Sequence, residues 1–144
     1  MIQKTIHLLE QMFASCDMDY DDLKESAIDS AFFEAHDNVR IVNSFLFNFS
    51  KLQDKIGQKF IKQVLYDLKE IDDFEVPFKD VLNIAEKLAL LSTDEWERFR
   101  EIRNLLSHEY PFSIEERVEN IQQALEIYPQ LKSSFERLKH AVER

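Results

Sequence analysis

The scarcity of turn-forming residues is the strongest constraint on the fold of this chain. One glycine and three prolines occur among its 144 residues. A sheet protein of this size needs many tight turns, and glycine supplies the backbone conformations that such turns require. Helices joined by a few connections need far fewer. The sequence therefore predicts an all-α fold, and we expect residues 1–144 to form a single helical domain around one core.

Composition narrows the class of protein further. Hydrophobic residues make up 44% and charged residues 32% of the chain, which is too apolar for disorder and too polar for a membrane span. The single Cys16 cannot form an internal disulfide or a thiolate metal site, and a reducing cytoplasm fits this usage. We expect Cys16 to be a small buried residue, and we expect no metal, no cofactor and no membrane association.

Apolar residues recur at three- and four-residue steps, which predicts an antiparallel bundle of about five helices and a short additional helix at the N-terminus. The first long helix is expected from about residue 20 to residue 56. Gly57 is expected to cap it in a conformation with positive φ, and a second helix is expected over about 58–68.

Capping signals predict where the remaining helices begin. Pro77 is suited to the start of the third helix, and Ser92 or Thr93 to the cap of the fourth. Ser113 and Glu116 form a capping-box pair for the last helix. Pro129 is expected either to kink this last helix or to split it.

Twelve phenylalanines are many for a chain of this length. Phe45, Phe47 and Phe49 place aromatic rings on more than one side of a single helix. A small domain cannot surround such a helix completely, so we expect an exposed aromatic face and a two-fold homodimer that covers it.

The formal net charge of −10 opposes attraction to nucleic acid and to anionic lipid. A polyanionic substrate must therefore be met by a local positive site. Lys51, Lys55, Lys59 and Lys62 recur at helical spacing and form either a stripe that follows phosphates or a solvated helix face. The second interpretation has the greater weight, because Asp54 lies among the lysines.

The best candidate for chemistry lies at the end of the fourth predicted helix. The common phosphate-loop, dinucleotide, zinc-protease and hydrolase motifs are absent from the sequence. His108 titrates near neutral pH and can move the proton of a ribose 2′-OH, while Arg103 can stabilise the charge of a phosphorane. Asn104, four residues before His108, can orient the imidazole. This mechanism requires no metal.

Two features of this candidate leave alternatives open. Arg103 and His108 are five positions apart and would point roughly 140° from each other on a continuous helix. Either the helix loosens before Pro111, or a second copy of the chain completes the site, and we favour both acting together. Arg100 can assist with phosphate or pair with Glu97 or Glu101.

The string RNLLSHEY at residues 103–110 resembles the RxxxxHxY motif of the HEPN superfamily, in particular HepT-like toxins and the related substrate-binding proteins of nucleotidyltransferases. The likeness extends over roughly residues 20–140, through SFLFNFSKLQDKIG, DVLNIAEKLALL and WERFREIRN. The alternative is that these residues have no catalytic role. Arg103 is then a surface residue, His108 ends the helix, and Tyr110 packs the helix end against the next helix.

The resemblance implies a HEPN-like bundle and a dimeric, metal-independent endoribonuclease that is the toxin of a toxin–antitoxin pair. Arg103 and His108 would be catalytic and Asn104 supporting, with RNA as substrate and tRNA as one candidate. It also implies a minimal nucleotidyltransferase as antitoxin, which in some members attaches AMP to the tyrosine that corresponds to Tyr110. In a related branch the protein is a non-catalytic substrate-binding subunit of that nucleotidyltransferase.

Overall fold

The computed structural model describes residues 1–106 and 113–143, and throughout these ranges it contains helices and no strand. The elements are α1 (Ile2–Lys24), the 3₁₀ helix η1 (Ser30–Glu34), α2 (His36–Lys55), the π-helical segment η2 (Ile56–Phe60), α3 (Ile61–Asp67), α4 (Phe78–Lys87), α5 (Thr93–Leu106) and α6 (Ile114–Val142). The predicted all-α fold class is confirmed.

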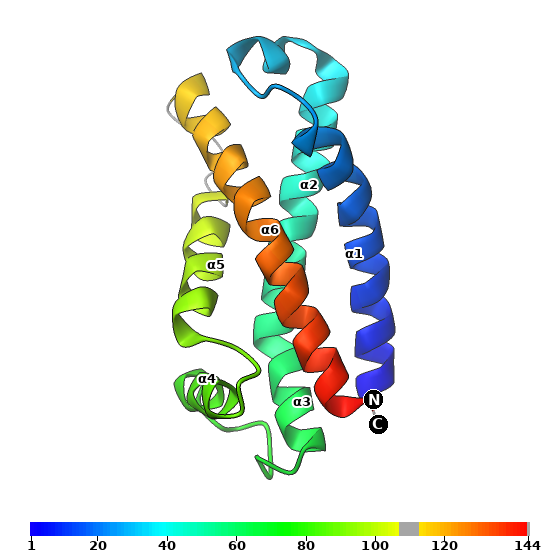
Figure 1. Ribbon diagram of the computed structural model, residues 1–144, viewed down its shortest axis with the longest axis vertical. Coiled ribbons are helices and arrows are strands. Elements are labelled where there is room, and N and C mark those ends of the chain that lie inside the picture. The colour runs from blue at the N-terminus through cyan, green and yellow to red at the C-terminus, as the bar shows by residue number, and fades with distance from the viewer. Residues whose placement is uncertain (107–112, 144) are drawn as a thin grey trace.

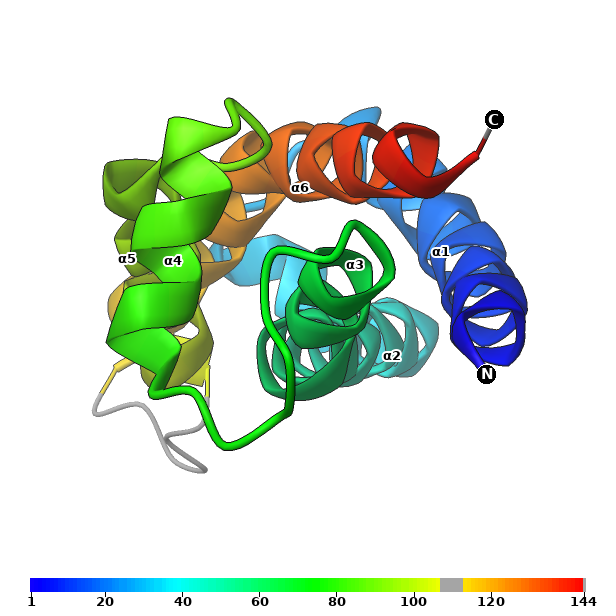
Figure 2. The same cartoon turned by 90° about the horizontal axis from the view of Figure 1, so that it is seen from below.

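The long helices run alternately up and down (Figure 1). The segments α2, η2 and α3 follow one another directly, and we call them together the α2–α3 rod. The rod lies between α1 on one side and α4 and α5 on the other, with α6 across a third side (Figure 2). The short α4 lies crosswise at one end of the bundle. Counting the rod as one helix, the described chain forms the predicted antiparallel bundle of about five helices.

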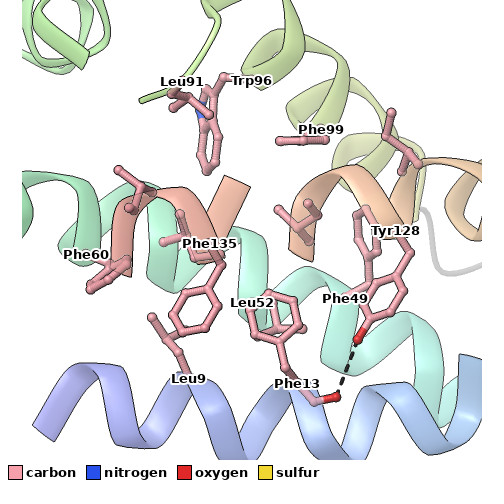
Figure 3. Close-up of a cluster of buried hydrophobic side chains, with 14 of the residues drawn as sticks. Leu9, Phe13, Phe49, Leu52, Phe60, Leu91, Trp96, Phe99, Tyr128 and Phe135 are labelled. Carbon is pink, nitrogen blue, oxygen red and sulfur yellow. Dashed lines mark hydrogen bonds between the residues drawn. The ribbon is translucent and has the colours of Figure 1, made fainter. Parts of the chain in front are cut away.

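Aromatic side chains from four helices fill the core (Figure 3). The rings of Phe13 on α1 and Phe135 on α6 stack with centroids 4.9 Å apart. Phe60 of η2 packs on the same Phe135 ring at 5.5 Å, and Phe49 and Trp96 are also fully buried. Burial of such large apolar surfaces is the main term that holds the helices together.

A polar network ties α1 to α6 beside this core. The hydroxyl of Tyr128 donates to Asp17 Oδ1 at 2.7 Å, and Lys132 Nζ donates to Asp17 Oδ2 at 2.5 Å. Cys16 is fully buried next to this network, as the sequence predicts. Burial raises the pKa of the Cys16 thiol to about 12, so the reactive thiolate is disfavoured near neutral pH.

The N-terminal third differs from the prediction. The expected helix from 20 to 56 is wrong, and the expected short N-terminal helix is the 23-residue α1. The chain turns between the two because short polar side chains bind the backbone: Ser26 Oγ donates to the carbonyl of Asp22, and Asp29 Oδ1 accepts from the Phe32 amide. Apolar spacing continues across this turn, since Ile28 is buried and Phe32 packs against the core, and spacing alone therefore did not reveal it.

Most of the capping predictions are confirmed. Ser92 Oγ accepts from the Glu95 amide at 3.3 Å, and Ser113 Oγ accepts from the Glu116 amide at 3.1 Å. Pro77 is the residue that precedes α4. Pro129 lies inside α6, which continues through it, so the split is excluded.

Phe47 is the exposed member of the aromatic run on α2. Phe45 and Phe49 are fully buried, whereas Phe47 is 63% exposed. The expectation that the monomer leaves part of this run uncovered is confirmed. No helix within the described ranges has the length and apolarity needed to cross a bilayer.

Gly57 does not cap a helix, and that prediction is wrong. It lies within η2 and has no positive φ. Its small size has another use: a Cβ atom at residue 57 would lie 2.6 Å from Cζ2 of Trp96. Since real Cβ atoms do not approach carbon so closely, the absent side chain allows the α2–α3 rod to contact the Trp96 ring of α5.

Replacing Gly57 with alanine tests this close approach. Gly57→Ala is expected to lower the free energy of unfolding by about 1–2 kcal/mol, because overpacking outweighs the higher helix propensity of alanine. Gln58→Ala, at the exposed neighbouring position, should leave stability nearly unchanged. In urea denaturation, combining Gly57→Ala with Trp96→Phe should cost less than the two single losses added, because phenylalanine lacks the ring atoms that clash. Strict additivity would contradict this explanation.

Two other residues hold the left-handed conformation that Gly57 was expected to adopt. Lys69 and Ala89 have φ of 64° and 58° and follow the ends of α3 and α4. The amide of the next residue then reaches back to the helix, as in Glu70 N to Leu65 O at 2.9 Å. Helix ends of this kind usually have glycine in the left-handed position, but here lysine and alanine occupy it.

Ala89→Gly is therefore expected to raise the free energy of unfolding by about 0.5–1 kcal/mol, because glycine removes the steric cost of a Cβ in this conformation. Ala14→Gly, at an exposed position inside α1, should lower it by about as much. Thermal denaturation of both variants measures whether the free energy of unfolding rises in Ala89→Gly and falls in Ala14→Gly. A loss of stability in Ala89→Gly would refute the argument.

Candidate functional site

A pocket of about 460 Å³ lies where the α2–α3 rod meets α5. Its walls come from the end of α2, from η2 and the start of α3, from the first residue of α4, and from α5. The lining residues are Gln53, Asp54, Gly57, Gln58, Lys62, Phe78, Trp96, Arg100, Arg103 and Asn104. Three of the predicted site residues, Arg100, Arg103 and Asn104, are thus brought to one pocket.

Arg103 is fixed in the pocket wall by Asp54. Its Nε donates to Asp54 Oδ1 and its Nη2 to Asp54 Oδ2, each at 2.9 Å. About 30% of each side chain is exposed. Hydrogen bonding to Asp54 raises the pKa of Arg103, so the guanidinium stays charged. Since this pair uses Nε and Nη2, and no other partner is found among the described residues, Nη1 remains available to a ligand.

Arg100 pairs with Glu97, as one of its two alternatives predicts. Nε and Nη2 of Arg100 both donate to Glu97 Oε2, at 3.1 and 2.7 Å. The pair is exposed, with 56% of the Arg100 side chain accessible, and such a pair exchanges readily with water or with a ligand. Arg100 is therefore paired and also faces the pocket.

His108 and Tyr110 lie outside the described residues. The described part of α5 ends at Leu106, two positions before His108. The assignment of these two residues thus stays a prediction from the motif.

The lysine series is only partly in the site. Lys62 lines the pocket and donates to the carbonyl of Phe74 at 3.0 Å. Lys51 lies with its Nζ 5.5 Å from the ring centroid of Phe47, and Lys59 is exposed. The lysines therefore do not converge on the pocket, in agreement with the solvated-face interpretation.

Asp54, Gln53 and Trp96 are site residues that the sequence did not identify as such. Asp54 and Arg103 are 49 positions apart, and no local spacing connects residues so distant. Trp96 is a large apolar residue in a helical pattern, which indicates a core position and not a site. The available signal for Gln53 was its place four positions after Phe49, which puts a glutamine on the apolar face of the helix.

The described side chains contain no group of three histidine, cysteine, aspartate or glutamate residues placed to hold a metal ion. The pocket contributes one carboxylate, Asp54, and that carboxylate is occupied by Arg103. Its polar groups are mainly cations and amides, which suit an anionic or amide-like ligand better than a cation.

The Asp54–Arg103 pair should also contribute to stability. Asp54→Asn keeps the shape and removes the charge, and it is expected to lower the free energy of unfolding by about 1 kcal/mol, since a half-buried bidentate pair is worth more than an exposed one. Glu97→Gln is the matched control and should leave stability nearly unchanged. Chemical denaturation of the two variants makes the comparison, and equal effects would contradict a special role for Asp54.

Three comparisons with known proteins give no family model, no curated protein and no solved structure that matches this chain. The likeness to the HEPN superfamily therefore rests on the motif and the helical pattern.

Proposed function

We propose that this chain is a HepT-like, metal-independent endoribonuclease, the toxin of a toxin–antitoxin pair, acting in the cytoplasm as a homodimer. The observation that carries the proposal is Arg103, which lines the pocket and is held by Asp54 through two hydrogen bonds that leave its Nη1 unused. Arg103 lies five positions before His108 in the sequence. A fixed cation stabilises charge that develops on a phosphorane without reorganising during the reaction.

In the proposed reaction, His108 removes the proton of a ribose 2′-OH. The oxygen then attacks the adjacent phosphorus, the bond from phosphorus to the 5′-oxygen of the next nucleotide breaks, and that oxygen takes a proton from water. The products are a 2′,3′-cyclic phosphate and a 5′-hydroxyl, and no metal takes part. Arg103 stabilises the phosphorane, Asn104 supports the imidazole, and Arg100 assists with a neighbouring phosphate.

The homodimer belongs to the proposal because Phe47, with 63% of its surface exposed on α2, is a residue that a second copy can cover. The proposed antitoxin is a minimal nucleotidyltransferase that modifies Tyr110.

One observation favours a second candidate, a non-catalytic substrate-binding subunit of that nucleotidyltransferase. Both arginines of the pocket are compensated by carboxylates, Arg103 by Asp54 and Arg100 by Glu97, and the chain carries a net charge of −10. The electrostatic field of such a protein opposes the approach of a long polyanion such as RNA.

Cleavage of total RNA and of tRNA in the presence of EDTA separates the two candidates. Wild-type protein is expected to produce 2′,3′-cyclic phosphate ends, and His108→Ala is expected to reduce cleavage by at least about a hundredfold, the usual size of a general-base contribution. His140→Ala, at an exposed histidine in the last turn of α6, is the matched control and should cleave normally. Intact RNA in all lanes, with helicity unchanged by circular dichroism, would reject the nuclease and favour the binding subunit.

A further inference from the structure

Gln53 is a buried polar side chain that has no partner among the described residues. It is only 6% exposed, yet among the described residues nothing forms a hydrogen bond with its amide. Buried amides are nearly always paired, because leaving them unpaired costs free energy. The other buried glutamine, Gln63, is 4% exposed and lies outside the pocket lining.

The unpaired Gln53 amide reaches the pocket. Gln63 Oε1 is the one side-chain polar atom of the described residues that is both sealed from solvent and unpaired. The amide atoms of Gln53 are therefore still accessible, and the space that its side chain borders is the pocket. A donor and acceptor pair with no protein partner among the described residues thus belongs to a residue that lines the same pocket as Arg103.

The surroundings of Gln53 match a nucleotide. A carboxamide offers one donor edge and one acceptor edge, which fits the hydrogen-bonding edge of a nucleobase. Phe78, which is partly buried, supplies aromatic surface in the same lining, and aromatic side chains favour flat bases. The volume of about 460 Å³ is in the range that small ligands occupy.

The charge of the lining matches the phosphate of a nucleotide. Its charged members are the cations Lys62, Arg100 and Arg103 and the single carboxylate Asp54. With Glu97, which pairs with Arg100 from outside the lining, the local sum is +1. The whole chain has a net charge of −10. A positive lining in an acidic protein concentrates an anionic ligand at that place.

We infer that this pocket binds one nucleotide unit, with the base paired to the Gln53 amide and the phosphate at Arg100 and Arg103. The inference rests on the proposed function in assigning the nucleotide to an RNA substrate, where it is the unit beside the scissile bond. The chemistry is the same for a free mononucleotide, and the experiment separates the two sources.

Trp96 is the only tryptophan of the chain and lies in the pocket lining, so it reports binding. AMP, GMP, CMP and UMP are titrated against the protein by tryptophan fluorescence and by calorimetry, which detects binding that leaves the fluorescence unchanged. Wild-type protein is expected to bind all four and to discriminate among the bases. Gln53→Met keeps the shape of the side chain, and it should weaken the preferred nucleotide about tenfold and abolish the discrimination.

Two further variants make the result specific. Gln63→Met replaces the other buried glutamine and should bind nucleotides as the wild type does. Arg100→Gln, on an exposed side chain, should weaken all four nucleotides equally, because it removes a phosphate contact and no base contact. If Gln53→Met fails to fold, the uniform loss expected in Arg100→Gln still tests the pocket. Absence of binding by both methods, or equal binding by Gln53→Met and Gln63→Met, would overturn the inference.

The outcome is distinguishable from that of the nuclease proposal. Nucleotide binding without RNA cleavage leaves the pocket established and rejects the nuclease, whereas cleavage that Gln53→Met leaves unchanged, together with no nucleotide binding, rejects the pocket alone. A 2′-O-methyl oligonucleotide, which cannot be cleaved through its 2′-oxygen, identifies the source of the ligand. Tighter binding of this oligonucleotide than of any mononucleotide indicates RNA, and tighter binding of a mononucleotide indicates a free nucleotide.

Discussion

The contact between Gly57 and the ring of Trp96 sets how closely the α2–α3 rod and α5 approach each other. The missing methyl group of Gly57 allows the short distance between these helices, because a Cβ at residue 57 would lie 2.6 Å from the indole. Trp96 is fully buried beneath this contact and packs edge to face on Phe99, with ring centroids 5.8 Å apart. The place where the only glycine of the chain occurs is thus the place where its two pocket-forming helices meet.

The polar site depends on that approach. Asp54 lies one turn before Gly57 on the rod, and at this helix separation its carboxylate reaches Arg103 of α5 with two hydrogen bonds of 2.9 Å. The π-helical turn over η2 changes the direction of the side chains that follow, and such turns are frequent at functional sites. Apolar packing therefore positions the cation, and the carboxylate orients it.

Sequence patterns predicted several helix starts well, but they missed the break between α1 and α2 and placed a helix end at Gly57, where the rod continues. The caps formed by Ser92 and Ser113 are hydrogen bonds to residues three positions ahead, so the sequence contains both partners side by side. The break between α1 and α2 was missed because the buried Ile28 keeps the apolar spacing through a turn that Asp29 stabilises. Periodicity reports which residues are buried, and a turn that also buries a side chain looks like helix.

The sequence by itself determined the all-α class, from the lack of glycine, and the motif that places Arg103, Asn104 and His108 in one short segment. Only the tertiary structure decided that Asp54 holds Arg103 across 49 positions of chain, that Gln53 is buried with no partner among the described residues, and that Gly57 serves close packing instead of a cap. The physical reason is the range of the interactions. Helix formation and capping depend on residues a few positions apart, whereas the pairing of two helix faces depends on the distance and rotation at which their side chains pack.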